Sequence, residues 1–273
     1  MGVVCCEAHA TDRSSTREQH VSLELYAYTC GFLTIPHGFL LEAAEGWITV
    51  PIPSYLIVHP AGKVLFDSGL NIQTQTDPEP YIGRVGSKYA TFHFRPGEEV
   101  SARLTAMSVA PEEITCIVNS HLHYDHCGGN VQLPNADVVV QRRERRHAMA
   151  LPDDDPGYRK VDFDTGQRTR EIEGEHDLFG DGSVVCLPTY GHTPGHQSLR
   201  VRTPNGEFVL CGDACYLAQS LERLHPPGVA ADREAALAVL RRFREMQARG
   251  ARIMFGHDPE FWKTVPQGPQ RLG

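Results

Sequence analysis

The run His121-Leu122-His123-Tyr124-Asp125-His126 constrains this chain more than any other segment. It places imidazoles and a carboxylate within a few consecutive residues. Imidazole nitrogens and carboxylate oxygens are standard ligands for zinc and related divalent ions, and few other roles would gather so many of them. The run therefore predicts a metal site. The alternative is a histidine-rich surface turn, and similar residues further along the chain make it the weaker interpretation.

The spacing within this run predicts more than one metal ion. Side chains alternate along an extended segment, so His121 and His123 point to one side and can chelate one ion, while Leu122 points into the core. Asp125 and His126 lie one turn further on and do not easily reach that ion. We therefore expect a second ion roughly 3.5–4 Å from the first.

Further candidate ligands follow at the ends of predicted strands, where sites collect in α/β folds. In the segment Tyr190–His196, we assign His196 as a ligand and His192 to a supporting role beside it. Asp213 follows an apolar run and can bridge two ions. His257 comes after the last predicted strand, and its Gly-His-Asp context favours ligation over an ordinary surface histidine.

Composition limits the kind of protein this is. The chain has 273 residues, 41% of them hydrophobic and 22% charged, with a net charge of −8. These values are typical of a globular protein, and the negative charge argues against nucleic acid as a partner. No apolar stretch is long enough to cross a membrane. We expect a disordered N-terminal lead over residues 1–20 and a single domain over 21–273, with a homodimer left open.

Eight cysteines are present, but no two are spaced as CxxC, and several lie in apolar runs or beside candidate ligands. We interpret them as reduced thiols and expect a cytoplasmic protein. The basic tract Arg142-Arg143-Glu144-Arg145-Arg146 is interpreted as the solvated face of a helix.

The hydrophobic pattern predicts an α/β fold of strands, helices, strands, a helix and a last strand. Residues 71–97 are expected to form a long excursion without regular structure. Prolines are expected to separate the strands at 47–50 and 54–59. The remaining strands are expected at 64–67, 114–119, 138–140, 184–188, 197–202, 207–211 and 253–255, and the helices at 100–107, 141–150 and 233–249.

Taken together, the motifs resemble the binuclear branch of the metallo-β-lactamase superfamily, from about Leu56 to Asp258. The resemblance implies an αββα sandwich with the metal site at one edge of its two sheets. It also implies that Asp67, in the segment Val64–Gly69, orients the ligand histidines. The implied metal ligands are His121, His123, Asp125, His126, His196, Asp213 and His257.

The segment Asp213-Ala214-Cys215-Tyr216 narrows the branch, because N-acyl-homoserine lactone lactonases carry a Tyr three residues after the bridging Asp. The segments 120–130, 191–198 and 255–258 resemble those lactonases too. The resemblance implies two divalent ions, with Zn²⁺ first and Co, Mn or Fe as substitutes. It implies lactone ring opening and quorum quenching, with Tyr216 and Asp125 as catalytic residues and a small-molecule acyl-homoserine lactone as substrate.

Other functions remain open at this stage. A glyoxalase II-like thioesterase, or another hydrolase of esters or lactones, would use much of the same ligand set without needing Tyr216. A di-iron oxygen reductase normally carries a flavin domain, which we do not expect after His257. A non-catalytic metal-binding module is disfavoured by the complete ligand set. Candidate residues for an acyl-chain channel are Phe39, Leu40, Tyr81, Ile82, Phe92, Phe94, Met107 and Trp262.

Overall fold

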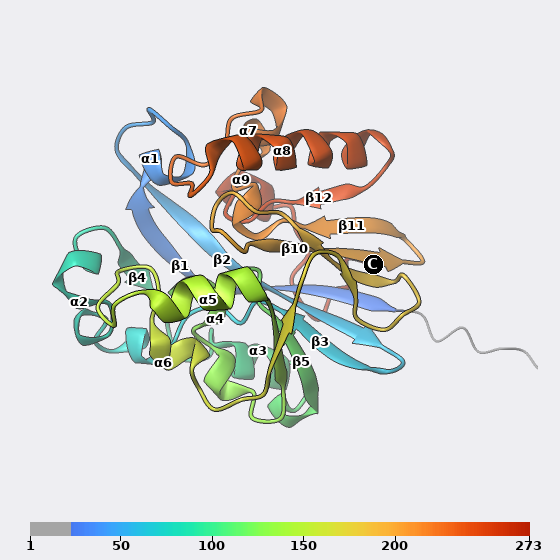
Figure 1. Cartoon of the computed structure of the whole chain (residues 1–273). Helices are drawn as coiled ribbons and strands as arrows, with labels where there is room; N and C mark the ends of the chain where they lie inside the picture. Colours follow the sequence, from blue (N-terminus) through green and yellow to red (C-terminus); the bar gives the residue numbers. More distant parts are fainter. Residues whose placement is uncertain (1–22) are drawn as a thin grey trace, which may run out of the picture.

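The computed structural model describes residues 23–273, which form two facing β-sheets with helices packed on their outer sides (Figure 1). The larger, seven-stranded sheet has the order β4-β1-β2-β3-β5-β6-β7, and the five-stranded sheet has the order β12-β11-β10-β9-β8. The predicted αββα sandwich is thereby confirmed. The predicted N-terminal lead, residues 1–20, lies outside the described residues.

The strands and helices have the following bounds. The strands are β1 Glu24–Pro36, β2 Trp47–His59, β3 Gly62–Phe66, β4 Thr91–His93, β5 Ile114–Val118, β6 Asp137–Gln141, β7 Thr169–Ile172, β8 His176–Asp177, β9 Val184–Pro188, β10 Gln197–Thr203, β11 Gly206–Leu210 and β12 Arg252–Met254. The α-helices are α1 His37–Leu40, α2 Glu79–Gly86, α3 Val100–Thr105, α4 Tyr124–Cys127, α5 Arg142–Ala150, α6 Lys160–Phe163, α7 Ala218–Arg223, α8 Arg233–Ala248 and α9 Pro259–Trp262. Single 3₁₀ turns are η1 Ile72–Gln75, η2 Pro111–Glu113, η3 Asn130–Gln132 and η4 Gly212–Ala214.

Alternation along the strands builds three layers of core. In β3, Val64 and Phe66 belong to the cluster between the two sheets, while Leu65 packs with α3 on the outer side. In β9, Val184 lies between the sheets and Val185 faces α8. Side chains of a strand point alternately to opposite faces, so strands buried on both faces read as continuous apolar runs.

Helix α8 closes the outer face of the smaller sheet, and its ends follow the sequence signals. The Asp232 carboxylate accepts a hydrogen bond from the Ala235 amide at 3.0 Å, which caps the first turn. Leu240 and Phe243 are fully buried against the sheet. Gly250, with φ of +100°, ends the segment in a conformation that suits glycine.

Two expectations about regular structure were wrong. Strand β2 runs unbroken through Pro51 and Pro53. Those prolines lie opposite a bulge in β1 on one side, and on the other side β3 pairs only from Tyr55 onward, so they lie where the pairing of β2 is already interrupted. The excursion at 71–97 is not irregular, because it contains η1, α2 and β4.

The ends of four strands meet at one edge of the sandwich. Strand β5 of the larger sheet ends just before the segment that begins at His121, and β9, β11 and β12 of the smaller sheet end before His192, Asp213 and His257. Within residues 23–273, no helix is long and apolar enough to span a membrane. All six cysteines in that range are free thiols in buried positions.

Candidate metal centre

The loops at this edge bring seven side chains into two groups of potential metal ligands. The first group is His121, His123, His192 and Asp213, and the second is Asp125, His126 and His257. Within each group the ligand atoms all lie within 4.8 Å of one another. In the first group the His123 Nδ1 atom lies 2.9 Å from His121 Nε2 and 3.2 Å from His192 Nε2.

Asp213 connects the two groups through its two carboxylate oxygens. Its Oδ2 atom lies 3.3 Å from His192 Nε2 and 3.7 Å from His121 Nε2, in the first group. Its Oδ1 atom lies 3.0 Å from His257 Nε2 and 3.1 Å from His126 Nε2, in the second group. Asp213, which we predicted to bridge two ions, therefore lies between the two groups of potential ligands.

The donor atoms fit bound cations better than they fit one another. His126 Nε2 and Asp213 Oδ1 are buried and face each other, yet neither has a hydrogen-bond partner. An unpaired buried polar atom is costly, and a cation placed between such atoms removes that cost. Three imidazoles with one carboxylate, and two imidazoles with two carboxylates, are donor sets that suit zinc and similar divalent ions.

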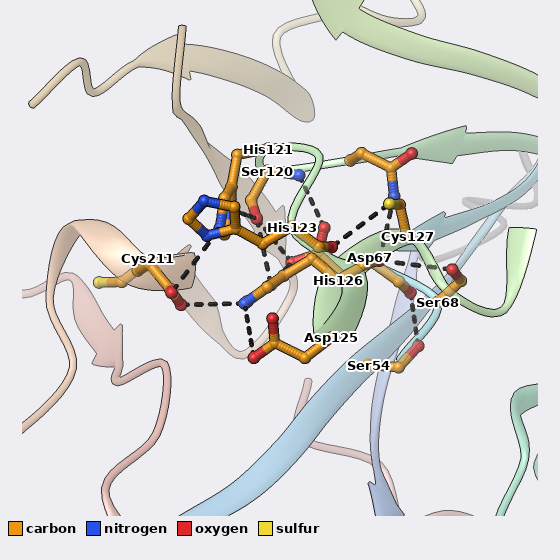
Figure 2. Close-up of polar contacts among 12 residues, drawn as sticks. Ser54, Asp67, Ser68, Ser120, His121, His123, Asp125, His126, Cys127 and Cys211 are labelled. Atoms are coloured by element: carbon orange, nitrogen blue, oxygen red, sulfur yellow. Dashed lines mark hydrogen bonds and ion pairs between the residues drawn. The ribbon is translucent and has the colours of Figure 1, made fainter. Parts of the chain in front are cut away.

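A second layer of hydrogen bonds holds the ligand rings in place (Figure 2). Asp67 Oδ2 accepts from His126 Nδ1 at 2.9 Å and from the Ser120 hydroxyl at 2.8 Å, while Oδ1 accepts from the Ser120 amide. The Ser120 hydroxyl also lies 3.0 Å from His121 Nδ1. His257 Nδ1 donates to the Pro51 carbonyl at 2.7 Å. Such contacts fix which ring nitrogen is free for a metal.

The structure reverses the assignment of His192 and His196. His192 Nε2 points into the first donor group, so His192, which we had given a supporting role, is the candidate ligand. His196 lies outside both groups because its Nε2 accepts a hydrogen bond from the Asp213 amide at 3.0 Å and its Nδ1 lies 2.8 Å from the Thr189 hydroxyl. Both ring nitrogens of His196 are therefore engaged with protein groups, and its contact with the Asp213 amide positions that residue.

Burial and charge set the protonation of these groups. Burial, together with neighbouring imidazoles, lowers the pKa of His121 and His123 well below the usual value, and burial also lowers that of His192. All three are therefore neutral, as ligation requires. Burial alone would lower the pKa of His126 as well, but Asp213, Asp125 and Asp67 together raise it well above its usual value. The second group thus sits in a strongly negative environment that favours a cation.

A cavity of about 490 Å³ opens onto both donor groups. Its lining includes both residues predicted to be catalytic, Asp125 and Tyr216. The Tyr216 hydroxyl lies 3.3 Å from His192 Nδ1, and its ring stacks on His257 with centroids 5.6 Å apart. The walls are largely apolar and are lined by Leu33, Ile35, Phe39, Val85, Tyr89, Ala90, Tyr124, Leu151, Tyr158 and Val229.

Most residues predicted to line an acyl channel do not do so. Of the eight candidates only Phe39 borders the cavity. The side chains of Leu40, Tyr81, Ile82, Phe94 and Trp262 are buried in the core instead. Sequence reasoning also missed Tyr158, whose ring meets His123 edge-on at 4.5 Å, and the buried Glu144 behind it. Neither has a motif of its own.

Residues that follow strands of both sheets form a cluster of potential metal ligands, and a cavity opens onto this cluster. These features place the protein among the metal-dependent hydrolases of αββα architecture. The chain belongs to the metallo-beta-lactamase superfamily, whose family model matches residues 47–257.

Named relatives and solved structures are similar to this chain along nearly their whole length. The N-acyl homoserine lactonase AttM of Azorhizobium caulinodans is 34% identical over 258 residues, covering 90% of this chain and 97% of that protein. The N-acyl homoserine lactonase AiiA of Bacillus thuringiensis subsp. kurstaki is 29% identical, covering 91% and 98%. A structure of an N-acyl homoserine lactone hydrolase, with the product N-hexanoyl-L-homoserine at its catalytic metal centre, has a TM-score of 0.83 and 28% identity, covering 91% and 98%.

Proposed function

We propose that this enzyme opens the lactone ring of N-acyl homoserine lactones by hydrolysis and so acts in quorum quenching. The observation that carries the proposal is the placement of the Tyr216 hydroxyl, which lies 3.3 Å from His192 of the first donor group, in a largely apolar cavity that opens onto both groups. A hydrolase needs a donor at that point for the oxygen of the substrate carbonyl. The full-length similarity to lactonases supports the same reaction.

The proposed resident cofactor is a pair of divalent cations, with Zn²⁺ as the first choice and Co, Mn or Fe as substitutes. His121, His123 and His192 would hold one cation, and Asp125, His126 and His257 the other, with Asp213 shared. Cations bound there supply Lewis acidity and a water molecule of lowered pKa.

The protein's own side chains have distinct tasks in the reaction. Burial raises the pKa of Tyr216 well above its usual value, so its phenol stays protonated and donates a hydrogen bond to the lactone carbonyl oxygen. This bond stabilises the negative charge that develops on that oxygen. Asp125 borders the cavity and is suited to carry a proton to the ring oxygen as the ring C–O bond breaks.

The cavity suits the remainder of such a substrate. Its volume of about 490 Å³ falls in the range of small-molecule sites, and its walls are apolar. An acyl chain would bury against those walls, while the lactone ring lies near the donor groups.

The reaction can be followed directly, because hydrolysis of the neutral lactone yields a carboxylate and releases one proton. We would measure proton release from hexanoyl-homoserine lactone with the Zn²⁺-loaded enzyme and its His123→Ala and Tyr216→Phe variants. We expect turnover that is abolished in the first variant and weakened in the second. Metal-replete protein that hydrolyses a glutathione thioester but no lactone would replace this proposal with the thioesterase function.

A further inference from the structure

Glu144 is a buried acidic residue within the most basic stretch of the chain. The tract Arg142–Arg146 was expected to form a solvated helix face, and Arg143 and Arg146 are indeed exposed. Glu144 differs, because its side chain points inward from α5 and the residue has an exposed fraction of 0%. A carboxylate buried this completely needs partners for all of its oxygen lone pairs.

Four hydrogen bonds meet the Glu144 carboxylate. Its Oε1 atom accepts from the Leu122 amide at 3.1 Å and from the Tyr158 hydroxyl at 3.0 Å. Its Oε2 atom accepts from the Thr193 hydroxyl at 2.6 Å and from the Gly195 amide at 3.1 Å. Each oxygen therefore receives one backbone N–H and one hydroxyl.

These partners come from the segments that carry the first donor group. Leu122 lies between His121 and His123, and Thr193 directly follows His192. Tyr158 packs its ring edge-on against His123, with centroids 4.5 Å apart. The Glu144 carboxylate thus connects the loop that carries His121 and His123 with the loop that carries His192. It also holds Tyr158, whose ring packs against His123.

The loop after His192 is also held close to α5 by its shape. A Cβ atom added to Gly195 would lie only 2.1 Å from the Glu144 backbone nitrogen, so only glycine permits this approach. The second donor group has different supports: His126 bonds to Asp67, and His257 bonds to the Pro51 carbonyl. Neither of those supports involves Glu144.

We propose that Glu144 is the positioning residue of the first donor group, holding His121, His123 and His192 at the spacing that one cation requires, while His126 and His257 of the second group have supports that do not involve Glu144. This inference rests on the proposed function only in taking those histidines as metal ligands. It predicts that the two cations respond differently to a change at Glu144.

The isosteric change Glu144→Gln is a sharp test, because a carboxamide has only one acceptor oxygen. Its NH₂ group would replace either Oε1 or Oε2. The Tyr158 or Thr193 hydroxyl can turn and accept from that group, but the Leu122 or Gly195 amide cannot. In either orientation one backbone N–H in a ligand-bearing loop loses its partner.

The experiment is a Zn²⁺ titration of the metal-depleted full chain against a chromophoric chelator, which yields the affinity of each equivalent. For Glu144→Gln we expect one equivalent to weaken by about 10–100-fold, as is usual when a side chain that orients ligands is lost, while the other stays within about twofold of the wild type. Absorption spectra of the Co²⁺-loaded variant should resemble those of His192→Ala more than those of His257→Ala.

Asp162→Asn is the matched control. Asp162 is another fully buried carboxylate, but its oxygens accept from Asn71 and Tyr81, not from the ligand loops. We expect this variant to keep both affinities, so general damage from altering a buried acid is separated from loss of positioning.

Two further variants keep the test decisive if Glu144→Gln does not fold. Thr193→Val and Tyr158→Phe each remove one hydroxyl from the same carboxylate, and each should weaken the same equivalent of Zn²⁺ by a few fold. Wild-type affinities for both equivalents in all folded variants of this set would overturn the role of Glu144. Failure of the wild-type chain to bind Zn²⁺ would overturn the proposed metal centre itself, and the role of Glu144 with it.

Discussion

In the proposed reaction, Tyr216 donates a hydrogen bond to the substrate carbonyl independently of any cation. Its hydroxyl is buried next to His192, and its ring is fixed by stacking on His257. Removing one such donor in other hydrolases reduces kcat by about 10²–10³-fold. Because cations would share the task here, we expect Tyr216→Phe to lower kcat for hexanoyl-homoserine lactone by about 10–100-fold. Steady-state kinetics with metal content measured in parallel checks this.

The control for that variant is Tyr26→Phe, which removes a tyrosine hydroxyl bonded to Glu24 on β1, away from the cavity. It should leave kcat unchanged.

Since burial keeps the pKa of Tyr216 well above its usual value, no loss of activity on the alkaline side should arise from ionisation of Tyr216 below about pH 9. Equal kcat for Tyr216→Phe and the wild type would remove Tyr216 from the mechanism.

The limits of sequence reasoning are clearest at His192 and His196. Both lie in one tight Gly- and Pro-containing loop between two strands. Their spacing along the chain therefore does not show which of the two is the metal ligand. The deciding contact is the hydrogen bond from the Asp213 amide to His196 Nε2, which joins residues from different strands. In contrast, the sequence alone indicated that the histidines and Asp125 of the run from His121 to His126 are candidate ligands, because they share one short segment, and the structure places all of them in the two donor groups.

Helix α6 is tied to η1 and α2 by one buried carboxylate, and this tie should make stability depend on pH. Asp162 Oδ1 accepts from the Asn71 side chain at 2.8 Å, and Oδ2 accepts from the Tyr81 hydroxyl. Burial raises its pKa to about 6, although those bonds and Arg159 oppose the rise. A carboxyl whose pKa is raised by folding favours the folded state at low pH, and this contribution is lost as pH rises through about 6.

Asp162→Asn should remove that dependence. A rise of about two pKa units corresponds to about 3 kcal/mol over the full titration, of which about 1 kcal/mol falls between pH 5 and 7.5. We therefore expect the free energy of unfolding of the variant, relative to the wild type, to increase by about 1 kcal/mol over that interval. Denaturant unfolding at both pH values measures it, and parallel pH profiles of the two proteins would exclude the effect.

Helix α1 contributes Phe39 to the cavity wall, and α2 contributes Val85 and Gly86. If an acyl chain lies along this wall, Phe39→Ala should raise KM for decanoyl-homoserine lactone more than for the butanoyl substrate. Loss of contact with two or three methylenes, at about 0.8 kcal/mol each, corresponds to roughly 15–60-fold for the long chain. The butanoyl substrate should change by less than about threefold, and equal changes for both would place the chain elsewhere.

At the scale of elements, the sequence predicted those helices and strands whose positions depend on hydrophobic periodicity and capping residues. Helix α8 was expected from Asp232, its apolar face and Gly250, and it begins and ends within one residue of the expected range. The buried position of the Glu144 side chain on α5 was not predicted, because its hydrogen-bond partners lie in three loops that are distant in the sequence. The continuity of β2 through its prolines was missed for a similar reason: it depends on a bulge in the neighbouring strand.

At the scale of the whole molecule, each donor group contains residues that follow strands of both sheets. His121, His123, Asp125 and His126 follow β5 of the larger sheet, whereas His192, Asp213 and His257 follow strands of the smaller sheet. An apolar core lies between the sheets, and the histidines and carboxylates of the two donor groups gather at one edge of the sandwich. Cations bound there would cross-link the two halves of the sandwich.

Metal removal should therefore lower stability as well as abolish activity. A cation that binds only the folded state adds about 4 kcal/mol when its concentration is about 1,000 times its Kd. For a chain of this size that corresponds to a rise in Tm of roughly 10 °C. We expect chelator-treated protein to melt lower by at least this amount, and Zn²⁺, Co²⁺ or Mn²⁺ but not Mg²⁺ to restore it, because imidazole-rich sites favour the former ions. Differential scanning calorimetry with and without each ion checks this, and a Tm that is indifferent to chelation would mean that the sheets need no metal to hold them together.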